Sequence, residues 1–153
     1  MSMPKQDSIW GEITLNKKVY KMLSRPLNDE SAEKVKAYKN EFGGFSSAPW
    51  ITDNYSWTIK DDKLYLNEIT IGMGSIRNLM PNIFGVDELF ANWQNEDLEL
   101  LVSKEDFDTE NKPKFKRVEM KIKILKFKDG LLLSTEDATK EFIREKRKNY
   151  IEE

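Results

Sequence analysis

The chain has 153 residues, the usual length of one domain, and its eight Phe, five Tyr and four Trp supply large apolar side chains for a core. It contains no Cys and no His, which excludes disulfides, thiolate nucleophiles and the commonest general base and metal ligand. The formal net charge is −2, no stretch approaches the roughly 20 apolar residues of a membrane span, and the N-terminus lacks the apolar core of a signal peptide, so we expect a soluble cytoplasmic protein.

The first part of the chain predicts two strands and a helix. Apolar side chains alternate with polar ones over residues 9–15, which predicts a strand, and residues 19–23 predict a second strand. Asn28 or Asp29 can cap a helix near residues 29–41, where acidic residues come early and basic residues late, as the helix dipole favours.

The central stretch, Y-S-W-T-I-K-D-D-K-L-Y-L-N-E-I-T-I at residues 55–71, predicts a β-hairpin. Two alternating runs flank Asp61-Asp62, and Asp tolerates the backbone conformation of a tight turn. We expect an irregular crossover at residues 76–85, because Pro81 is unfavourable inside a helix, and a short helical turn at residues 86–93.

The last part of the chain has the most regular alternation, over residues 117–127, which predicts a strand that follows a fifth strand at 97–102 and a charged loop at 103–113. A turn at Asp129-Gly130 should lead into a partner strand at residues 131–133. Ser134 then resembles a capping residue, so we expect a C-terminal helix.

These elements together predict an α+β fold with an antiparallel β-sheet of about six to seven strands and two helices, near residues 29–41 and 136–150. They leave open whether the sheet is curled. We expect a single domain over residues 1–153, with residues 1–7 disordered and the helix end at 144–153 exposed.

The middle of the chain resembles a family. The motifs are Y-K-M-L-S-R-P-L at 20–27, F-S-S-A-P-W at 45–50, the hairpin at 55–69 and D-E-L-F-A-N-W at 87–93. Together they resemble a group of small uncharacterised bacterial proteins with an aromatic-rich W-x-I-x-D-x-x-L-Y-L hairpin followed by L-F-A-x-W. The resemblance covers about residues 11–100 and implies a fold and a bacterial origin. It carries no assigned activity, and the usual Gly after the last Trp is missing, so it transfers no catalytic residue.

Charge is distributed unevenly along the second half. Basic residues dominate from Lys112 to Lys128 and acidic ones from Asp87 to Glu110, so the two segments either pair within the fold or present an acidic face to a basic partner. The acidic residues are Asp87, Glu88, Glu96, Asp97, Glu99, Glu105, Asp106, Asp108 and Glu110. We therefore hypothesise a non-catalytic protein-binding module, in particular an immunity-type protein that neutralises a basic bacterial toxin domain.

The alternative hypothesis is a small-ligand-binding protein with an aromatic-lined cavity in the sheet. Its lining would be Trp50, Trp57, Trp93, Phe45 and Tyr65, with Trp10 as a further aromatic. The same side chains can instead fill the core of the sheet, which is the favoured interpretation, because Trp57 alternates with polar neighbours as a core residue does.

Other chemistries receive less support. Lysines on the strand at 117–127 could bind nucleic acid, but the pI near 5.5 weighs against it. The pattern Asp106-x-Asp108-x-Glu110 begins like a calcium loop and then departs from it, with Asn111 at the position of the invariant Gly. An enzyme that uses carboxylates alone ranks third, so we expect no enzyme, no cofactor, no metal, no nucleic acid and no membrane partner.

Overall fold

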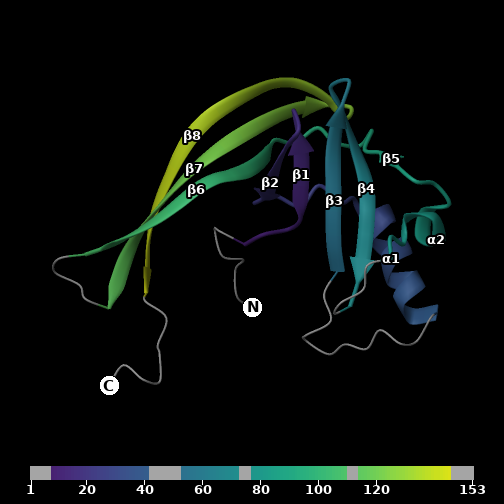
Figure 1. The fold of residues 1–153 in the computed structure, drawn as a ribbon, viewed down its shortest axis with the longest axis horizontal. Coiled ribbons are helices and arrows are strands. Elements are labelled where there is room, and N and C mark those ends of the chain that lie inside the picture. Colours follow the sequence, from purple (N-terminus) through teal and green to yellow (C-terminus); the bar gives the residue numbers. More distant parts are fainter. Residues whose placement is uncertain (1–7, 42–52, 73–76, 110–113, 146–153) are drawn as a thin grey trace.

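The computed structural model describes residues 8–41, 53–72, 77–109 and 114–145. These residues form one mixed β-sheet and two helices, which confirms the α+β prediction with eight strands instead of six to seven (Figure 1). The strands are β1 (Glu12–Leu15), β2 (Lys18–Met22), β3 (Asp53–Lys60), β4 (Lys63–Ile71), β5 (Leu89–Phe90), β6 (Leu98–Asp108), β7 (Phe115–Lys128) and β8 (Leu131–Glu145). The helices are α1 (Asp29–Glu41) and α2 (Met80–Phe84).

The sheet curls until its two sides meet. Its order is β3-β1-β2-β6-β7-β8-β4-β5, and β3 also pairs with β4, so the strands form a ring. The junction between β4 and β8 is narrow, because only Lys63 and Leu131 pair there. The pairs are antiparallel except β1 with β3, which run parallel, so the expectation of a purely antiparallel sheet is wrong at this pair.

The central hairpin is confirmed as β3 and β4, joined by Asp61-Asp62. Both turn residues have positive φ, 51° and 59°, as a two-residue type I′ turn requires. Asn67 is an extra residue in β4, because the register shifts between Ser56 and Trp57. That bulge explains why the buried apolar residues of β4 change phase halfway along the strand.

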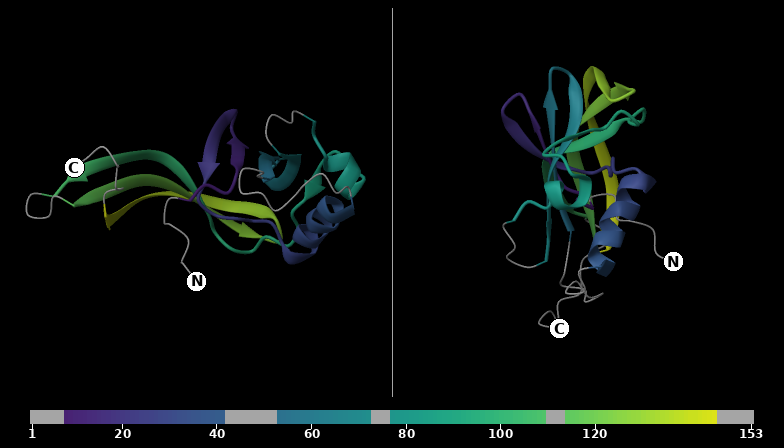
Figure 2. Two further views of the ribbon diagram at one scale, coloured as in Figure 1. Left: turned by 90° about the horizontal axis from the view of Figure 1, so that it is seen from below. Right: turned by 90° about the vertical axis from the view of Figure 1, so that its right-hand side faces the viewer.

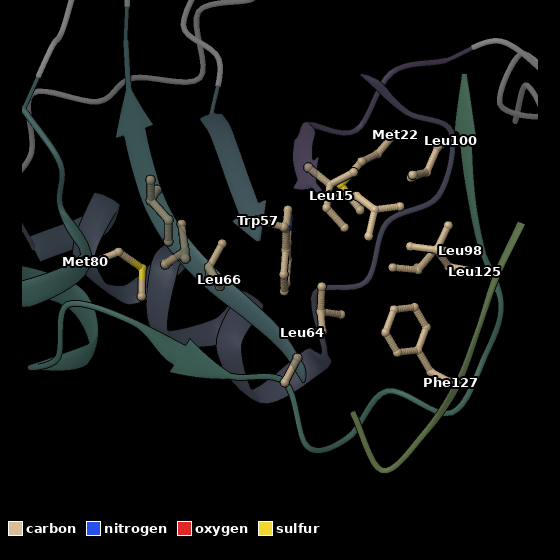
Figure 3. Close-up of a cluster of buried hydrophobic side chains, with 14 of the residues drawn as sticks. Leu15, Met22, Trp57, Leu64, Leu66, Met80, Leu98, Leu100, Leu125 and Phe127 are labelled. Carbon is tan, nitrogen blue, oxygen red and sulfur yellow. The ribbon is translucent and has the colours of Figure 1, made fainter. Parts of the chain in front are cut away.

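The main core lies inside the curled sheet, and Trp57 is at its centre. Figure 3 shows the indole of Trp57 with Leu66 and Met80 on one side and Leu98, Leu125 and Phe127 on the other. Helix α1 contributes buried Val35, and its N-terminus is capped by Asn28, whose Oδ1 accepts a hydrogen bond of 3.0 Å from the backbone of Ser31. The helix predicted near residues 29–41 is therefore confirmed.

Strands β6, β7 and β8 continue past the body as a three-stranded extension (Figures 1 and 2). We call residues 101–108, 115–122 and 138–145 the arm. The arm has a small apolar cluster of its own, separate from the main core. Its fully buried members are Val118, Met120 and Ile122, packed against Leu23, Leu101, Ile124, Ala138 and Phe142.

The helix predicted near residues 136–150 is wrong in the part that the structure describes, because residues 131–145 form β8. Residues 146–150 lie outside the described residues, as do residues 1–7. Ala138 and Phe142 are four positions apart, and this spacing returns to the same side of a helix and of a strand alike. Pairing with β7 decides between the two, since both residues lie opposite buried side chains of that strand.

Three shorter predictions are also wrong. Residues 103–108, expected in a charged loop, continue β6 because they pair with β7. The expected crossover at 76–85 contains α2, and Pro81 lies in its first turn, where a missing N–H costs no hydrogen bond. Within the expected helical turn at 86–93, Leu89 and Phe90 instead form the short strand β5, which pairs with β4. Within the described ranges, no helix is both long and apolar enough to cross a membrane.

Candidate functional site

Strand β6 divides the predicted acidic segment between two faces of the sheet. Side chains alternate along a strand, so Glu105 points to one face while Asp106 and Asp108 point to the other. Asp87 and Glu88 lie far along the ring, before β5, and Glu110 lies outside the described residues. The nine acids therefore do not form one continuous face.

Several of these acids pair with bases of the fold. Glu88 accepts a hydrogen bond of 2.6 Å from Lys60, and Asp106 accepts one of 2.7 Å from Lys116 on β7. Glu99 is paired with Lys140 of β8. Part of the acidic segment is thus neutralised by the neighbouring basic strand. Glu96, Asp97 and Glu105 are exposed.

The arm contains an acidic row that the sequence reasoning missed. Glu105 lies opposite Glu119, and Glu119 lies opposite Glu141, so three carboxylates cross the three strands side by side. Arg117 contacts two of them, at 3.2 Å from Glu119 and 2.8 Å from Glu141, and its guanidinium lies 4.2 Å from the ring centre of Phe107. Sequence alone could have found Glu119 as an outward residue of a predicted strand, but not its neighbours.

The predicted aromatic lining is dispersed. Trp57 is buried in the main core, and Trp93 donates a hydrogen bond of 2.7 Å from its indole nitrogen to the carbonyl of Pro26. Tyr65 packs against Phe90, with 5.6 Å between ring centres. None of the three lines either of the two clefts described below, and Phe45 and Trp50 lie outside the described residues.

The larger cleft, of about 910 Å³, lies where the chain enters β1 and passes β3. Trp10 and Gly11 both lie opposite Met22. The carbonyl oxygen of Met22 accepts a hydrogen bond from the N–H of Trp10, and the N–H of Met22 donates one to the carbonyl oxygen of Gly11. Gly11 has φ of 141°, and a Cβ there would lie 2.6 Å from the carbonyl oxygen of Tyr55. The absence of a side chain at Gly11 therefore permits the close approach of the two segments that form the cleft wall.

One wall of the cleft is a connected polar group. Asp53 accepts hydrogen bonds from Lys39 of α1 at 2.9 Å and from the hydroxyl of Tyr55 at 3.1 Å. Burial raises the pKa of the Tyr55 hydroxyl above its ordinary value, and the negative charge of Asp53 raises it further. Tyr55 is thus held as a neutral phenol.

The remaining lining carries both charges and an exposed indole. Lys21 and Glu12 lie opposite each other, and Glu12 lies beside Ser56, which faces Glu68, so a polar row crosses β2, β1, β3 and β4. The guanidinium of Arg25 lies 6.0 Å from the ring centre of Trp10. Such a wall can bind a polar small molecule that has a flat ring and an ionised group. The sequence grouped Trp10 with the aromatics but gave no sign of its partners.

A smaller cleft, of about 490 Å³, separates the β1–β2 hairpin from the base of the arm. Lys18, Lys121 and Lys123 line it together with Tyr20 and Val102. Lys123 is paired with Asp137 at 3.1 Å. This cleft is more basic than acidic, so the arm carries the two signs of charge in different places.

In the part of the chain that the structure describes, no three Asp or Glu side chains are grouped so that they could hold a metal ion. Comparisons with protein-family models, with curated proteins and with solved structures each find nothing that matches this chain.

Proposed function

We propose that this protein is a non-catalytic protein-binding module and that the arm contacts its partner. The observation that carries the proposal is the arm itself, which leaves the body and keeps large apolar side chains in solvent. Val102 is 45% exposed, Phe115 37% and Ile143 56%. Exposed apolar groups of this kind, surrounded by charges, are typical of interaction surfaces.

The absence of the usual nucleophiles and bases also supports a binding role. The sequence has no Cys and no His. The carboxylate of Asp53, which lines the larger cleft, accepts a hydrogen bond on each of its two oxygens, from Lys39 and from Tyr55. A carboxylate whose two oxygens are already engaged in this way is poorly placed to take a proton from a substrate.

We further propose that the partner is a basic toxin domain, which would make this an immunity-type protein. The row of Glu105, Glu119 and Glu141 supports this choice, since three carboxylates lie side by side there and Arg117 contacts two of them. A row of carboxylates on an extended arm would attract a basic surface over a distance and align it with the exposed apolar groups.

Pull-down with the products of neighbouring genes tests this proposal. We expect one basic product to bind more tightly than micromolar, and its toxic activity to fall when this protein is added. Glu105→Lys should slow association several-fold at low salt, because it reverses one charge of the row. Glu33→Lys is the matched control, since Glu33 is an exposed acid on α1 in the body. If no neighbouring product binds, or both variants act alike, the acidic-row proposal is wrong.

A second candidate function is the binding of a small polar ligand in the larger cleft. It is favoured by the exposed indole of Trp10, which lies next to Arg25 at the edge of the Asp53 and Tyr55 wall. A thermal-shift screen of metabolites would test it. We expect a ligand that raises the melting temperature and quenches tryptophan fluorescence, and we expect Trp10→Ala to abolish both effects. A screen in which Trp10→Ala responds like the unmodified protein contradicts this site.

A further inference from the structure

In the part of the chain that the structure describes, the outer edge of β8 is open over most of its length. Among the residues that the structure describes, β8 pairs with β7 on one side along the whole strand, whereas on its other side only Leu131 is paired, with Lys63. The pairing of β8 with β7 shifts register opposite Lys126 and Phe127, and from Ser134 onward β8 pairs regularly. Alternate N–H and C=O groups of this stretch point outward, and such an edge is a template for another strand.

Apolar side chains flank this open stretch at both ends. Leu133 is 63% exposed and Ile143 is 56% exposed, which makes them the two most exposed large apolar residues of β8 in the part that the structure describes. Between them the edge carries charges of both signs, among them Glu136 and Lys140. Charges on an edge strand commonly prevent pairing with other strands, so the order of the charges decides whether pairing is prevented or favoured.

The charges of β8 are complementary to those of a second, antiparallel β8. In a two-fold pair centred on Ala138, Glu136 of each copy lies opposite Lys140 of the other, and no like charges meet. The same arrangement brings Leu133, which is the extra residue of the bulge at the end of the regular stretch, near Ile143 of the other copy, so that the two exposed apolar residues cover each other. Opposite charges and apolar pairs directly across a sheet are each stabilising.

Neighbouring registers all place like charges face to face. Residues directly opposite each other in an antiparallel pair point to the same face of the sheet. The two-fold axis that relates the two copies must therefore lie at a residue position, and the register can change only by moving that axis one whole residue at a time. Centring the pair on Glu136, Asp137 or Lys140 sets that residue opposite its own copy, and centring it on Thr139 sets Asp137 opposite Glu141. Among centres from residue 136 to residue 140, Ala138 is therefore the one that sets no like charges opposite each other.

We propose that two copies of this protein associate through antiparallel pairing of their β8 edges, centred on Ala138. The β6, β7 and β8 strands of the two copies then form one continuous sheet. Lys140 already contacts Glu99, and Glu136 lies 3.6 Å from Lys126, so each new contact would add to an ion pair that already exists. This association does not depend on the toxin partner proposed above, and its test uses the protein alone.

Mass in solution and a single-cysteine variant test the proposal. We expect light scattering to give twice the 18.0 kDa of the chain at micromolar concentrations. Paired residues across antiparallel strands have Cα atoms about 4.5–5.5 Å apart, within reach of a disulfide. Because the chain has no Cys, oxidised Ala138→Cys should form a covalent dimer, whereas Ser103→Cys, exposed on the opposite edge of the arm, should not.

Charge placed at the exposed apolar pair gives an independent test. Leu133→Lys combined with Ile143→Lys sets two lysines together at each end, and we expect the dissociation constant to rise roughly tenfold or more. Leu133→Glu combined with Ile143→Lys sets opposite charges together and should preserve the dimer. Val19→Lys, a matched change at an exposed Val of β2, should have no effect.

Two results would overturn the inference. One is an unmodified protein that stays monomeric throughout the micromolar range. The other is a dimer that Ala138→Cys does not trap faster than Ser103→Cys and that responds equally to both double variants. Circular dichroism of each variant separates loss of pairing from loss of folding; Leu133, Ile143, Val19 and Ser103 are exposed, whereas Ala138 packs against the arm cluster.

Discussion

At the scale of single residues, Asp53 links helix α1 to strand β3. One of its carboxylate oxygens accepts a hydrogen bond from the hydroxyl of Tyr55 in the same strand, and the other accepts one from Lys39 of α1. Buried polar groups need such partners, because an unpaired one costs about 1–3 kcal/mol. The indole N–H of Trp57 has no partner among the described residues although it is buried, so the core accepts this cost where a large ring fills its centre.

The raised pKa of Tyr55 predicts a pH dependence of stability. The folded state retains the phenolic proton after the unfolded chain begins to lose it near the ordinary value of 10.0. The contribution of Tyr55 to stability is therefore complete below about pH 10 and is lost as the pH rises further. We expect Tyr55→Phe to lose less unfolding free energy than the unmodified protein between about pH 9 and pH 11 in urea titrations.

Tyr65→Phe is the matched control, because it removes a phenol from the neighbouring strand without touching Asp53. Equal losses of stability in the unmodified protein and in Tyr55→Phe across this pH range would show that burial of Tyr55 has no such effect.

At the scale of elements, the arm depends on a core of its own. Val118, Met120 and Ile122 are almost completely buried, although the arm consists of only three strands. The bulge near the start of β8 makes this possible. It lets Leu132 face the main core, while Ala138 and Phe142 reach the opposite face of the sheet and cover the arm cluster.

A separate cluster predicts separate stability. Met120→Ala should destabilise the arm by about 2–5 kcal/mol, as other buried Met truncations do. We expect amide protection to fall in residues 139–145 of β8 while the amides around Trp57 keep theirs, measured by hydrogen exchange. Leu66→Ala, a truncation in the main core, should lower protection in the body. Equal loss in arm and body after Met120→Ala would mean that the two clusters unfold as one.

At the scale of the whole molecule, the ring is closed by two turns and one connecting segment. The backbone N–H of Leu132 donates a hydrogen bond of 2.7 Å to the carbonyl oxygen of Asp62. The N–H of Leu64 donates one of 3.0 Å to the carbonyl oxygen of Gly130. Residues 91–95 contact both the β3–β4 hairpin and the β7–β8 turn. The N–H of Ala91 donates a hydrogen bond to the carbonyl oxygen of Leu64, and the N–H of Gly130 donates one to the carbonyl oxygen of Gln94. The turn between β7 and β8 is thus attached to the hairpin of β3 and β4 by a few backbone hydrogen bonds in one place.

Gly130 tests this junction. It has φ of 80°, and a Cβ there would lie 2.5 Å from the carbonyl oxygen of Ala91. We expect Gly130→Ala to cost about 2–4 kcal/mol, from the left-handed conformation and the forced shift together, measured by chemical denaturation. Lys17→Gly is a useful contrast, because Lys17 has φ of 68° in the exposed β1–β2 turn and should gain up to about 1 kcal/mol. A Gly130→Ala protein of unchanged stability would show that the junction can move.

The elements with strong local signals follow from the sequence. The hairpin around Asp61-Asp62, the helix capped by Asn28 and the turn at Asp129-Gly130 all depend on residues close in the chain. Alternation over residues 117–127 predicted β7, and Trp57 was assigned to the core on the same basis. In these segments the preferred backbone conformation and the burial pattern agree, so neighbouring residues are sufficient.

Other features of the fold and of both candidate surfaces depend on tertiary pairing. Ala138 and Phe142 fit a helix or a strand equally well, and only the long register with β7 makes them part of β8. A tight turn at Asp129-Gly130 without the bulge would set Glu119 opposite Lys140, whereas the observed bulge sets it opposite Glu141.

Strand pairing therefore decides where the acidic row and the cleft beside Tyr55 lie. It also decides which edge of β8 is left open. The sequence by itself determined which segments turn and which alternate, because those preferences are local. The tertiary structure decided which faces and charges meet, because one inserted residue in a strand moves every later side chain to the other face.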